Sequence, residues 1–488
     1  MNITLLTDFY QITMAYAYWK RGMAEEEAIF HHSFRSKPFK GGYAVFAGLQ
    51  QFIEYIESFT YTTSDIDYLR DMQGNDGQQL FEEGFLVYLL GMKFTCNIDA
   101  VPEGTVVFPH EPLVRVQGPV LQCQLLETPL LNLLNFPTLI ATKASRIVLA
   151  AEGDEVLEFG LRRAQGVNGA LTASRAAYIG GCSSTSNVLA GKLYDIPVRG
   201  TQAHSWVMLF DEEEEAFRNY AEAMPNNCIL LVDTYDTLEG VSKAIRVGKW
   251  LESRGGKFVG IRLDSGDFTY LSIESRKLLD SAGFTEALIV ASNDLDENII
   301  ADLKRQGARI DVWGVGTNLV TAKDQPALNG VYKLAAVRNG EGWDYKIKLS
   351  EQMEKISNPG ILQVRRYYFE GQNIADAIYD LNIGLESNVI VDPMDSTRRK
   401  DLPKGVTEED LLQPIYREGT LVYDIPSLLE TRQRTIEGLS GFHSGVKRFV
   451  NPHQYVVGLE LDLYRYKIDL INKIRSKDES IISSRCSE

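Results

Sequence analysis

Short apolar runs alternate with amphipathic stretches between residues 155 and 313. The runs have the length of buried strands, and stretches such as 237–252 and 268–282 repeat their apolar positions with a helical period. Strands that alternate with helices in this way form βαβ units with a parallel sheet. Several such units in succession favour a closed or incomplete parallel α/β barrel, similar to a TIM barrel, over an open sheet. The strands are expected at 155–159, 197–200, 228–233, 258–263, 287–291 and 310–313.

The regions on either side of this alternating pattern are mixed in character. Residues 4–21 are expected to form a helix with one apolar face, and 101–108 and 113–119 short strands bounded by Pro and Gly turns. A helical stretch starts near residue 125, and a strand is expected at 345–349. We therefore divide the chain into an N-terminal α+β domain, a barrel domain and a mixed C-terminal segment, with bounds at 1–140, 141–340 and 341–488.

Composition and charge limit the classes of function. The 488 residues are 44% hydrophobic and 24% charged, as in ordinary globular proteins. The net charge of −16 disfavours nucleic-acid binding, which needs a basic surface, although local arginines can still bind a small anion. The five cysteines are scattered without metal-ligand spacing, which favours reduced thiols in a cytoplasmic protein. Neither a signal peptide nor a membrane span is expected, because the chain has no suitable apolar run.

Polar residues stand where the predicted strands end, and this is the edge at which barrel enzymes place their active sites. Arg262 and Asp264 are two positions apart on one strand, so both side chains point to the same side. The residues at these strand ends are Arg162, Arg163, His204, Asp233, Asp236, Arg262, Asp264, Ser292, Asn293, Asp294, Gly314, Gly316 and Thr317.

Two of these groups suit a phosphorylated sugar. Arg262 and Asp264 either form a structural salt bridge or bind a ligand, and a carboxylate here suits ribose hydroxyls or Mg²⁺. The sequence 314–317 either forms a simple turn or, because glycine lets backbone N–H groups approach closely, binds a phosphate. Together these residues describe a pocket for a sugar phosphate.

The remaining charged residues are open to two interpretations. Arg162 and Arg163 are structural ion-pair donors or, because the guanidinium fork matches phosphate and carboxylate, anion ligands. His204 is either an ordinary surface or core histidine or a functional one at a helix start. The acidic run 211–215 is expected to be a solvated helix face, and adjacent His31 and His32 would point opposite ways on a strand, which disfavours a metal pair.

The ordered set of segments resembles the nicotinate phosphoribosyltransferase family over nearly the whole chain. Each segment is moderately specific, and the set in this order is very specific. The segments are 5–14, 159–166, 186–191, 200–205, 231–237, 261–267, 315–321, 326–334 and 451–455.

The resemblance implies a fold and a reaction. The fold is the barrel of the type II phosphoribosyltransferases, with an α+β sandwich domain built from the N-terminal segment and a C-terminal segment packed on it. Nicotinate displaces pyrophosphate from 5-phosphoribosyl 1-pyrophosphate to give nicotinate mononucleotide, with Mg²⁺ assisting, in NAD synthesis. The family couples this step to ATP hydrolysis through a phosphohistidine, and His204 matches that histidine. A homodimer with the active site near its interface is also implied.

The resemblance also assigns roles to residues. Arg262 and Thr201 would bind nicotinate, Phe159 would stack on its ring, and Tyr10 would cover the ring, donated across a dimer interface. Asp264 would bind the ribose hydroxyls, and Asp233 is a further substrate-binding residue. Arg162 and Arg163 would lie near the pyrophosphate, and the 5′-phosphate would be held by Ser292, Asn293, Gly314, Gly316 and Thr317.

The expectation of nicotinate rather than nicotinamide as the substrate rests on the absence of an acidic residue. The related nicotinamide enzymes carry an aspartate ahead of the third barrel strand, and the comparable stretch here, 183–187, has none. Without that acceptor, and with arginine nearby, a carboxylate ligand is favoured. The alternatives are a nicotinamide or quinolinate phosphoribosyltransferase, a barrel enzyme for another sugar phosphate, and a non-catalytic metabolite sensor.

Overall fold

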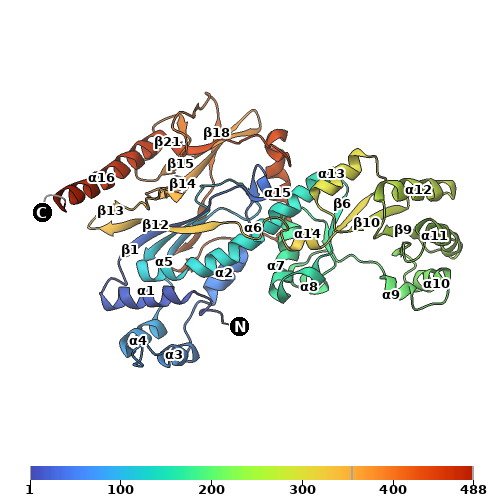
Figure 1. Ribbon diagram of the computed structural model, residues 1–488, viewed down its shortest axis with the longest axis horizontal. Coiled ribbons are helices and arrows are strands. Elements are labelled where there is room, and N and C mark those ends of the chain that lie inside the picture. The colour runs from blue at the N-terminus through green and yellow to red at the C-terminus, as the bar shows by residue number, and fades with distance from the viewer. Residues whose placement is uncertain (1, 353–354, 486–488) are drawn as a thin grey trace. The chain divides into compact units, whose positions relative to one another are not determined.

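The computed structural model describes residues 2–352 and 355–485. The chain forms two compact units. Unit 1 comprises Met1–Thr138, Ala327–Pro426 and Glu437–Glu488, and unit 2 comprises Leu139–Pro326 and Ser427–Ile436. Two helices, α6 (Glu127–Ala150) and α15 (Leu428–Ser440), begin in one unit and end in the other (Figure 1). Among the described residues, no helix has both the length and the apolarity that crossing a membrane requires.

Unit 2 is built on a six-stranded parallel sheet with the order β7-β6-β11-β10-β9-β8. Its two edge strands, β7 and β8, do not pair with each other, so the barrel is incomplete. The strands are β6 (Glu155–Glu158), β7 (Ser184–Thr185), β8 (Cys228–Leu231), β9 (Phe258–Leu263), β10 (Leu288–Asn293) and β11 (Val312–Val315).

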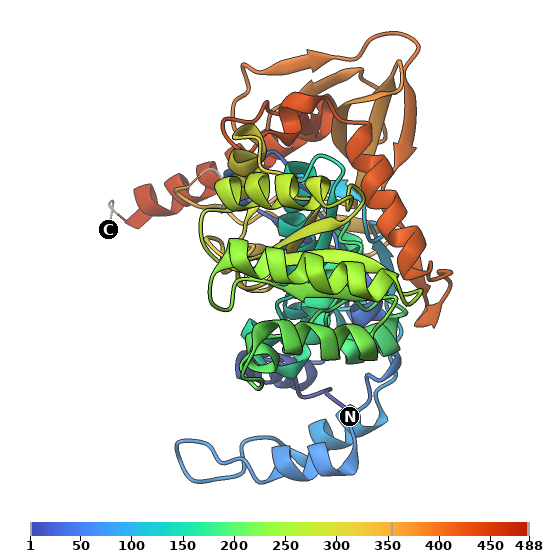
Figure 2. The same ribbon diagram turned by 90° about the vertical axis from the view of Figure 1, so that its right-hand side faces the viewer.

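Helices connect these strands, and α10, α11 and α12 run side by side across the face of the sheet that Figure 2 turns toward the viewer. Several begin at a polar residue that accepts a hydrogen bond from the first turn. Asp236, Asp267 and Asp296 cap α11, α12 and α13 in this way. The helices of unit 2 are α7 (Gly166–Ile179), α8 (Val188–Tyr194), α9 (His204–Val207), α10 (Glu213–Ala223), α11 (Thr237–Glu252), α12 (Phe268–Ser281), α13 (Glu297–Arg305) and α14 (Thr317–Val320), with a 3-10 turn η2 (Leu161–Arg163).

Close packing of helix on strand depends on glycine at one position of α11. A Cβ atom at Gly240 would lie 2.1 Å from the carbonyl oxygen of Val232, so no larger residue fits there without a shift of the helix. The apolar face of α11 buries Val241, Ala244 and Val247. Helix and strand are thereby held close together just after the point where β8 ends.

Unit 1 contains two larger sheets, and both combine distant parts of the chain. The seven-stranded sheet has the order β13-β12-β1-β5-β3-β19-β20, so that strands from both ends of the sequence lie in one layer. Its strands are β1 (Glu27–Phe34), β3 (Asn97–Ala100), β5 (Val114–Pro119), β12 (Gly330–Asn339), β13 (Gly342–Tyr345), β19 (Gln413–Arg417) and β20 (Thr420–Leu421).

The second sheet of unit 1 has six strands in the order β17-β16-β21-β15-β14-β18. These are β14 (Leu362–Phe369), β15 (Gln372–Asp380), β16 (Val389–Val391), β17 (Arg399–Asp401), β18 (Thr407–Asp410) and β21 (Val457–Glu460). A small sheet pairs β2 (Ala44–Val45) with β4 (Val106–Val107). The remaining helices are α1 (Phe9–Lys20), α2 (Leu49–Glu57), α3 (Thr63–Arg70), α4 (Glu83–Gly91), α5 (Val120–Leu125) and α16 (Leu461–Arg485), with 3-10 turns η1 (Pro38–Lys40) and η4 (Ser444–Lys447).

The structure corrects several expectations from the sequence. Residues 197–200 form only an isolated bridge at Val198, and the strand beside β6 is instead β7. The chain from 327 to 340, expected in the barrel domain, belongs to unit 1, because β12 pairs with β1. The strand expected at 345–349 lies earlier, at β13. Glu213, in the acidic run, is buried and forms a 3.1 Å ion pair with Lys243 rather than facing solvent.

Candidate active site

Arg262, on β9, is the centre of the polar cluster at the carboxyl edge of the unit 2 sheet. Its guanidinium donates from Nε to Ser292 Oγ at 2.7 Å and from an Nη atom to Asp264 Oδ1 at 2.7 Å. The other Nη atom donates to Thr201 Oγ1 at 3.1 Å. These contacts join β9, β10 and the loop before α9, so Arg262 is held in one orientation at this edge.

Asp264 lies beside Arg262, as the period of a strand requires. Its Oδ1 accepts hydrogen bonds from Arg262 and from the Ser292 hydroxyl. Partial burial raises the pKa of Asp264, but the Ser292 hydrogen bond and the Arg262 charge outweigh burial and hold that pKa below its ordinary value. Asp264 is therefore ionised at neutral pH and able to accept hydrogen bonds from sugar hydroxyls.

His204 begins α9 and turns its imidazole toward the same cluster. Its Nε2 lies 3.7 Å from Asp264 Oδ2, and its Nδ1 lies 3.1 Å from the hydroxyl of Thr234. The side chain of His204 is 40% exposed, so the ring remains open to a ligand. A half-exposed imidazole that is oriented by a hydroxyl and faces a carboxylate is suited to nucleophilic or acid–base chemistry.

Asp233 follows β8 and supports the loop that carries Asp264. Its Oδ2 accepts from the backbone N–H of Asp264 at 2.8 Å and from the Ser265 hydroxyl at 2.7 Å. The other oxygen, Oδ1, is buried and has no hydrogen-bond partner among the described residues. Asp233 thus fixes the backbone at Asp264 rather than presenting a freely exposed carboxylate.

Phe159 directly follows β6 and lies beside the end of the neighbouring strand β11. Its ring is 5.9 Å from the guanidinium of Arg262, and its N–H donates to Val315 O at 2.8 Å. A Cβ atom at Gly314 would come within 2.7 Å of the Phe159 ring, so the absence of a side chain at 314 makes room for it. Phe159 is only partly buried, so its ring is available to stack on a planar ligand.

The loops that follow β6 and β11 lie against each other. A Cβ atom at Gly316 would be 3.3 Å from Phe159 O, and Thr317 begins α14 directly after it. Arg162 and Arg163 are exposed in η2, and in the described part of the chain no carboxylate lies within ion-pairing distance of either. Both guanidinium groups are therefore available to an anionic ligand.

Asn293, at the end of β10, has a backbone φ of +147°, a conformation that side-chain-bearing residues rarely adopt. Its side chain accepts from the N–H of Asp294 at 2.8 Å. Such strain is kept where the surrounding structure requires it, and here it turns the chain sharply at the sheet edge, next to buried Ser292.

Tyr10 belongs to α1 of unit 1, whereas the other predicted site residues belong to unit 2. It is 48% exposed, and its pKa is raised by partial burial and by the charge of Glu127. The predicted residues that the structure brings together in unit 2 are Phe159, Thr201, His204, Asp233, Arg262, Asp264, Ser292, Gly314 and Gly316.

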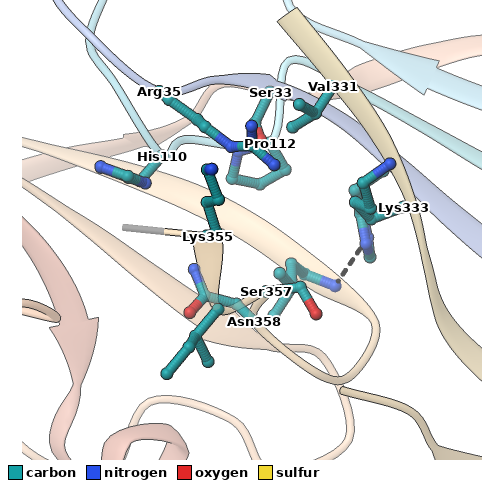
Figure 3. A pocket seen from close by; sticks show the side chains of 12 residues that line it. Ser33, Arg35, His110, Pro112, Val331, Lys333, Lys355, Ser357 and Asn358 are labelled. Carbon is teal, nitrogen blue, oxygen red and sulfur yellow. Dashed lines mark hydrogen bonds between the residues drawn. The ribbon is translucent and has the colours of Figure 1, made fainter. Parts of the chain in front are cut away.

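Sequence reasoning missed a basic pocket in unit 1. Arg35, Lys333 and Lys355 line it together with His31 and His110, and none of its described lining residues is acidic. Figure 3 shows the Arg35 and Lys355 side chains extending toward the same region. Burial lowers the pKa of Lys333, and the charges of Lys348 and Arg35 lower it further, although Glu127 opposes them. The crowding of positive charge suits a phosphate-bearing ligand.

Thr234 is a second residue that the sequence reasoning missed. Its hydroxyl contacts His204 Nδ1, although it lies 30 residues further along the chain. The only signal in the sequence was its place between Asp233 and Asp236 at a predicted strand end.

Comparisons with known proteins agree over nearly the whole chain. Residues 5–135 match the model of the nicotinate phosphoribosyltransferase N-terminal domain, 155–344 that of the nicotinate phosphoribosyltransferase family, and 363–467 that of the C-terminal domain. The nicotinate phosphoribosyltransferase of Bacillus subtilis is 45% identical and is aligned over 98% of this chain and 97% of its own length. The human protein of that name is 34% identical over 93% of this chain and 94% of its own.

Solved structures give the same result. The crystal structure of human nicotinic acid phosphoribosyltransferase aligns with a TM-score of 0.83 at 31% identity, covering 95% of this chain and 99% of the human chain. The structure of nicotinate-nucleotide pyrophosphorylase from Pyrococcus furiosus, at 22% identity and a TM-score of 0.67, shares the fold. The resemblance seen in the sequence is confirmed: the chain belongs to the nicotinate phosphoribosyltransferase family.

Proposed function

We propose that this protein transfers the phosphoribosyl group of 5-phosphoribosyl 1-pyrophosphate to nicotinate, in the synthesis of NAD. The ring nitrogen of nicotinate forms a bond to the anomeric carbon, and the bond from that carbon to the pyrophosphate oxygen breaks, its electron pair leaving with pyrophosphate. The observation that carries this proposal is the Arg262, Asp264 and Ser292 cluster at the carboxyl edge of the unit 2 sheet, within a chain of this family.

The binding of nicotinate is assigned to one side of this cluster. Arg262 supplies the fixed positive charge that a ring carboxylate needs, with the Thr201 hydroxyl beside it. All three guanidinium nitrogens of Arg262 already donate to protein oxygens. The substrate carboxylate therefore takes the place of the longer contacts that Arg262 makes to the Thr201 hydroxyl, at 3.1 Å, and to the Gln202 carbonyl, at 3.4 Å. Phe159 stacks on the ring.

The sugar phosphate is assigned to the neighbouring strand ends. Asp264 accepts from the ribose hydroxyls, and Asp233 holds its backbone. The backbone after β10 and β11 surrounds the 5′-phosphate, with glycine permitting close approach. Arg162 and Arg163 face the leaving pyrophosphate, where positive charge lowers the barrier because negative charge grows there. The 5′-phosphate residues are Ser292, Asn293, Gly314, Gly316 and Thr317.

We also propose that ATP is a co-substrate that phosphorylates His204. The γ-phosphoryl group bonds to an imidazole nitrogen, and its bond to the ADP oxygen breaks. Support comes from the exposure of His204 and its position 3.7 Å from Asp264, a residue of the sugar site. Two negative charges added here repel or reorganise the ligands of pyrophosphate, which links ATP cleavage to product release.

Mg²⁺ fits this site as an ion that enters with the pyrophosphate. Mg²⁺ in phosphate-transfer sites uses one or two carboxylates and completes its shell with substrate oxygens and water. The described residues contain no group of three or more His, Cys, Asp and Glu that could hold a metal by themselves, and Asp264 and Asp233 are the carboxylates at the site. When bound, the ion neutralises charge on the leaving group.

Assembly and location are further parts of the proposal. We infer a cytoplasmic homodimer in which Tyr10 of one copy covers the nicotinate ring bound to the other. The support is that Tyr10 is exposed on unit 1, whereas the other predicted ring contacts belong to unit 2.

A product assay tests the proposed function. Purified protein is given 5-phosphoribosyl 1-pyrophosphate and Mg²⁺ with nicotinate, nicotinamide or quinolinate, with and without ATP, and the mononucleotide is identified by mass. We expect nicotinate mononucleotide, with an ATP stimulation that His204→Ala abolishes. Product from nicotinamide alone would transfer the assignment to the nicotinamide enzymes, and no product from any ring would favour a metabolite sensor.

A further inference from the structure

A buried carboxylate at the end of β6 has no place in the reaction described above. Glu158 is only 1% exposed and directly precedes Phe159, yet its side chain points into unit 2 rather than to the open edge of the sheet. Burying an ionised carboxylate costs several kcal/mol unless hydrogen bonds compensate for the lost water. The sequence therefore retains Glu158 here against a cost, and its contacts explain why.

Three donors from three segments converge on this carboxylate. The backbone N–H of Gly160 donates to Oε1. The Ser174 hydroxyl of α7 and the Thr185 hydroxyl of β7 donate to Oε2 at 2.9 Å and 2.5 Å. Asn187, which caps α8, extends the network, because its N–H donates to Thr185 Oγ1 at 3.0 Å and its amide to Ser174 Oγ at 3.2 Å. Glu158 thus ties the turn after β6 to α7, β7 and α8.

The turn fixed by Glu158 carries the residues assigned to both substrates. Phe159 is held from the other side as well, by its N–H bond to Val315 O. Gly160 is packed so closely that a Cβ atom there would lie 2.2 Å from Val320 Cγ1. Arg162 and Arg163 follow within one turn, and the Arg163 N–H donates to Gly160 O at 2.8 Å. A shift at Gly160 would therefore move the aromatic ring and both guanidinium groups.

We propose that Glu158 is a positioning residue for the reaction: its carboxylate holds the Phe159–Arg163 turn so that the ring meets nicotinate and the arginines meet pyrophosphate. The inference rests on the proposed function for the identity of the two substrates. The fixing of the turn itself follows from the contacts of Glu158 and is testable without substrates. Glu158 touches neither substrate and acts only through Phe159 and the arginines.

The test compares three variants. Glu158→Ala removes the acceptor. Glu158→Gln keeps it, because the amide oxygen accepts from Gly160 while the amide N–H₂ donates to the two hydroxyls, which rotate to accept. Ser174 already has an alternative acceptor at Ala170 O, 3.0 Å away. Glu155→Ala is the matched control, since Glu155 is an exposed glutamate at the other end of the same strand.

Two readouts are measured on each intact protein. The first is the KM and kcat for nicotinate and for 5-phosphoribosyl 1-pyrophosphate. The second, without substrates, is the rate of tryptic cleavage after Arg162 and Arg163, which reports how firmly the turn is held. For Glu158→Ala we expect kcat/KM to fall about tenfold or more, with both KM values raised, because small misplacements of binding groups cost this much. Cleavage of the turn should be faster, Glu158→Gln should restore both readouts to within about threefold, and Glu155→Ala should match the parent.

Other outcomes would overturn the proposal. If Glu158→Ala lowers only the melting temperature and the yield of active protein, with KM values and cleavage unchanged, Glu158 is structural. If Glu158→Gln is as defective as Glu158→Ala, the charge rather than the hydrogen-bond geometry matters. If Glu158→Ala does not fold, Thr185→Val removes one of the three donors instead, and the proposal requires that it raises the KM values and speeds cleavage of the turn. A parent protein that forms no product would refute the proposed function. The cleavage rates would then still test whether Glu158 fixes the turn.

Discussion

Replacing Arg262 by lysine is the substitution that tests the ring site most sharply. Arg262 donates to Ser292, Thr201 and Asp264 and to the Gln202 carbonyl. A lysine ammonium keeps the charge but not the planar fork, so it cannot hold the two strands and the substrate carboxylate at once. Asp264 would also lose the guanidinium nitrogen of Arg262 that now lies 2.7 Å from its Oδ1.

The size of the effect follows from these contacts. A hydrogen bond to a charged group contributes about 1.5–3 kcal/mol, and loss of one such bond to the substrate corresponds to roughly a 10- to 150-fold change in kcat/KM. We therefore expect Arg262→Lys to lower kcat/KM for nicotinate by about this factor, mainly through a higher KM. Any turnover of nicotinamide should change less, because that ring has no carboxylate to lose.

The assay is steady-state formation of mononucleotide with each ring varied at saturating 5-phosphoribosyl 1-pyrophosphate. Arg254→Lys is the control, because Arg254 lies over the Trp250 ring at 4.7 Å, in a helix-end contact outside the candidate site. An unchanged KM for nicotinate in Arg262→Lys, or an equal loss for both rings, would refute the assignment of the carboxylate to Arg262.

Three further predictions concern other parts of the molecule. Arg163→Ala should raise the KM for 5-phosphoribosyl 1-pyrophosphate more than that for nicotinate, because its exposed guanidinium is assigned to the leaving group, and initial-rate kinetics would decide. Asp236→Ala should cost about 1 kcal/mol in urea unfolding without changing either KM, since Asp236 caps α11. Burial lowers the pKa of His32 to about 4 from an ordinary value near 6.5, although its Asn135 contact opposes this. As pH falls below about 6.5, the unfolded state binds a proton at His32 that the folded state does not bind. The free energy of unfolding should therefore be about 2 kcal/mol lower at pH 5 than at neutral pH because of this group. In urea titrations at both pH values, His32→Asn should lack this part of the pH dependence.

Local signals in the sequence predicted the central part of the fold. The bounds of β9 and α11 agree with the apolar period and with the capping aspartate, because both features depend on neighbouring residues only. β7 gave no such signal. It consists of Ser184 and Thr185, and it is held by pairing with β6 and by the buried Glu158. A strand with no apolar run is recognised only once its partners are known.

The site residues likewise divide into those that local sequence reveals and those that only long-range contacts reveal. Arg262 and Asp264 could be found from the sequence, because a strand places residues two apart on one side and the pattern locates the strand end. The contact of Thr234 with His204 joins two loops that no periodic pattern relates. The basic pocket brings Arg35 together with Lys333 and Lys355, about 300 residues away along the chain, through the pairing of β1 with β12. Contacts of this kind depend on topology and not on local sequence.

The most direct test of the central claim is a crystal structure of the protein with nicotinate mononucleotide bound. We expect the product at the carboxyl edge of β9, β10 and β11, its carboxylate on Arg262, its ribose on Asp264 and its phosphate at the loop after β11. A product bound away from this edge, or with its carboxylate on a different cation, would contradict the assignment of this cluster as the active site.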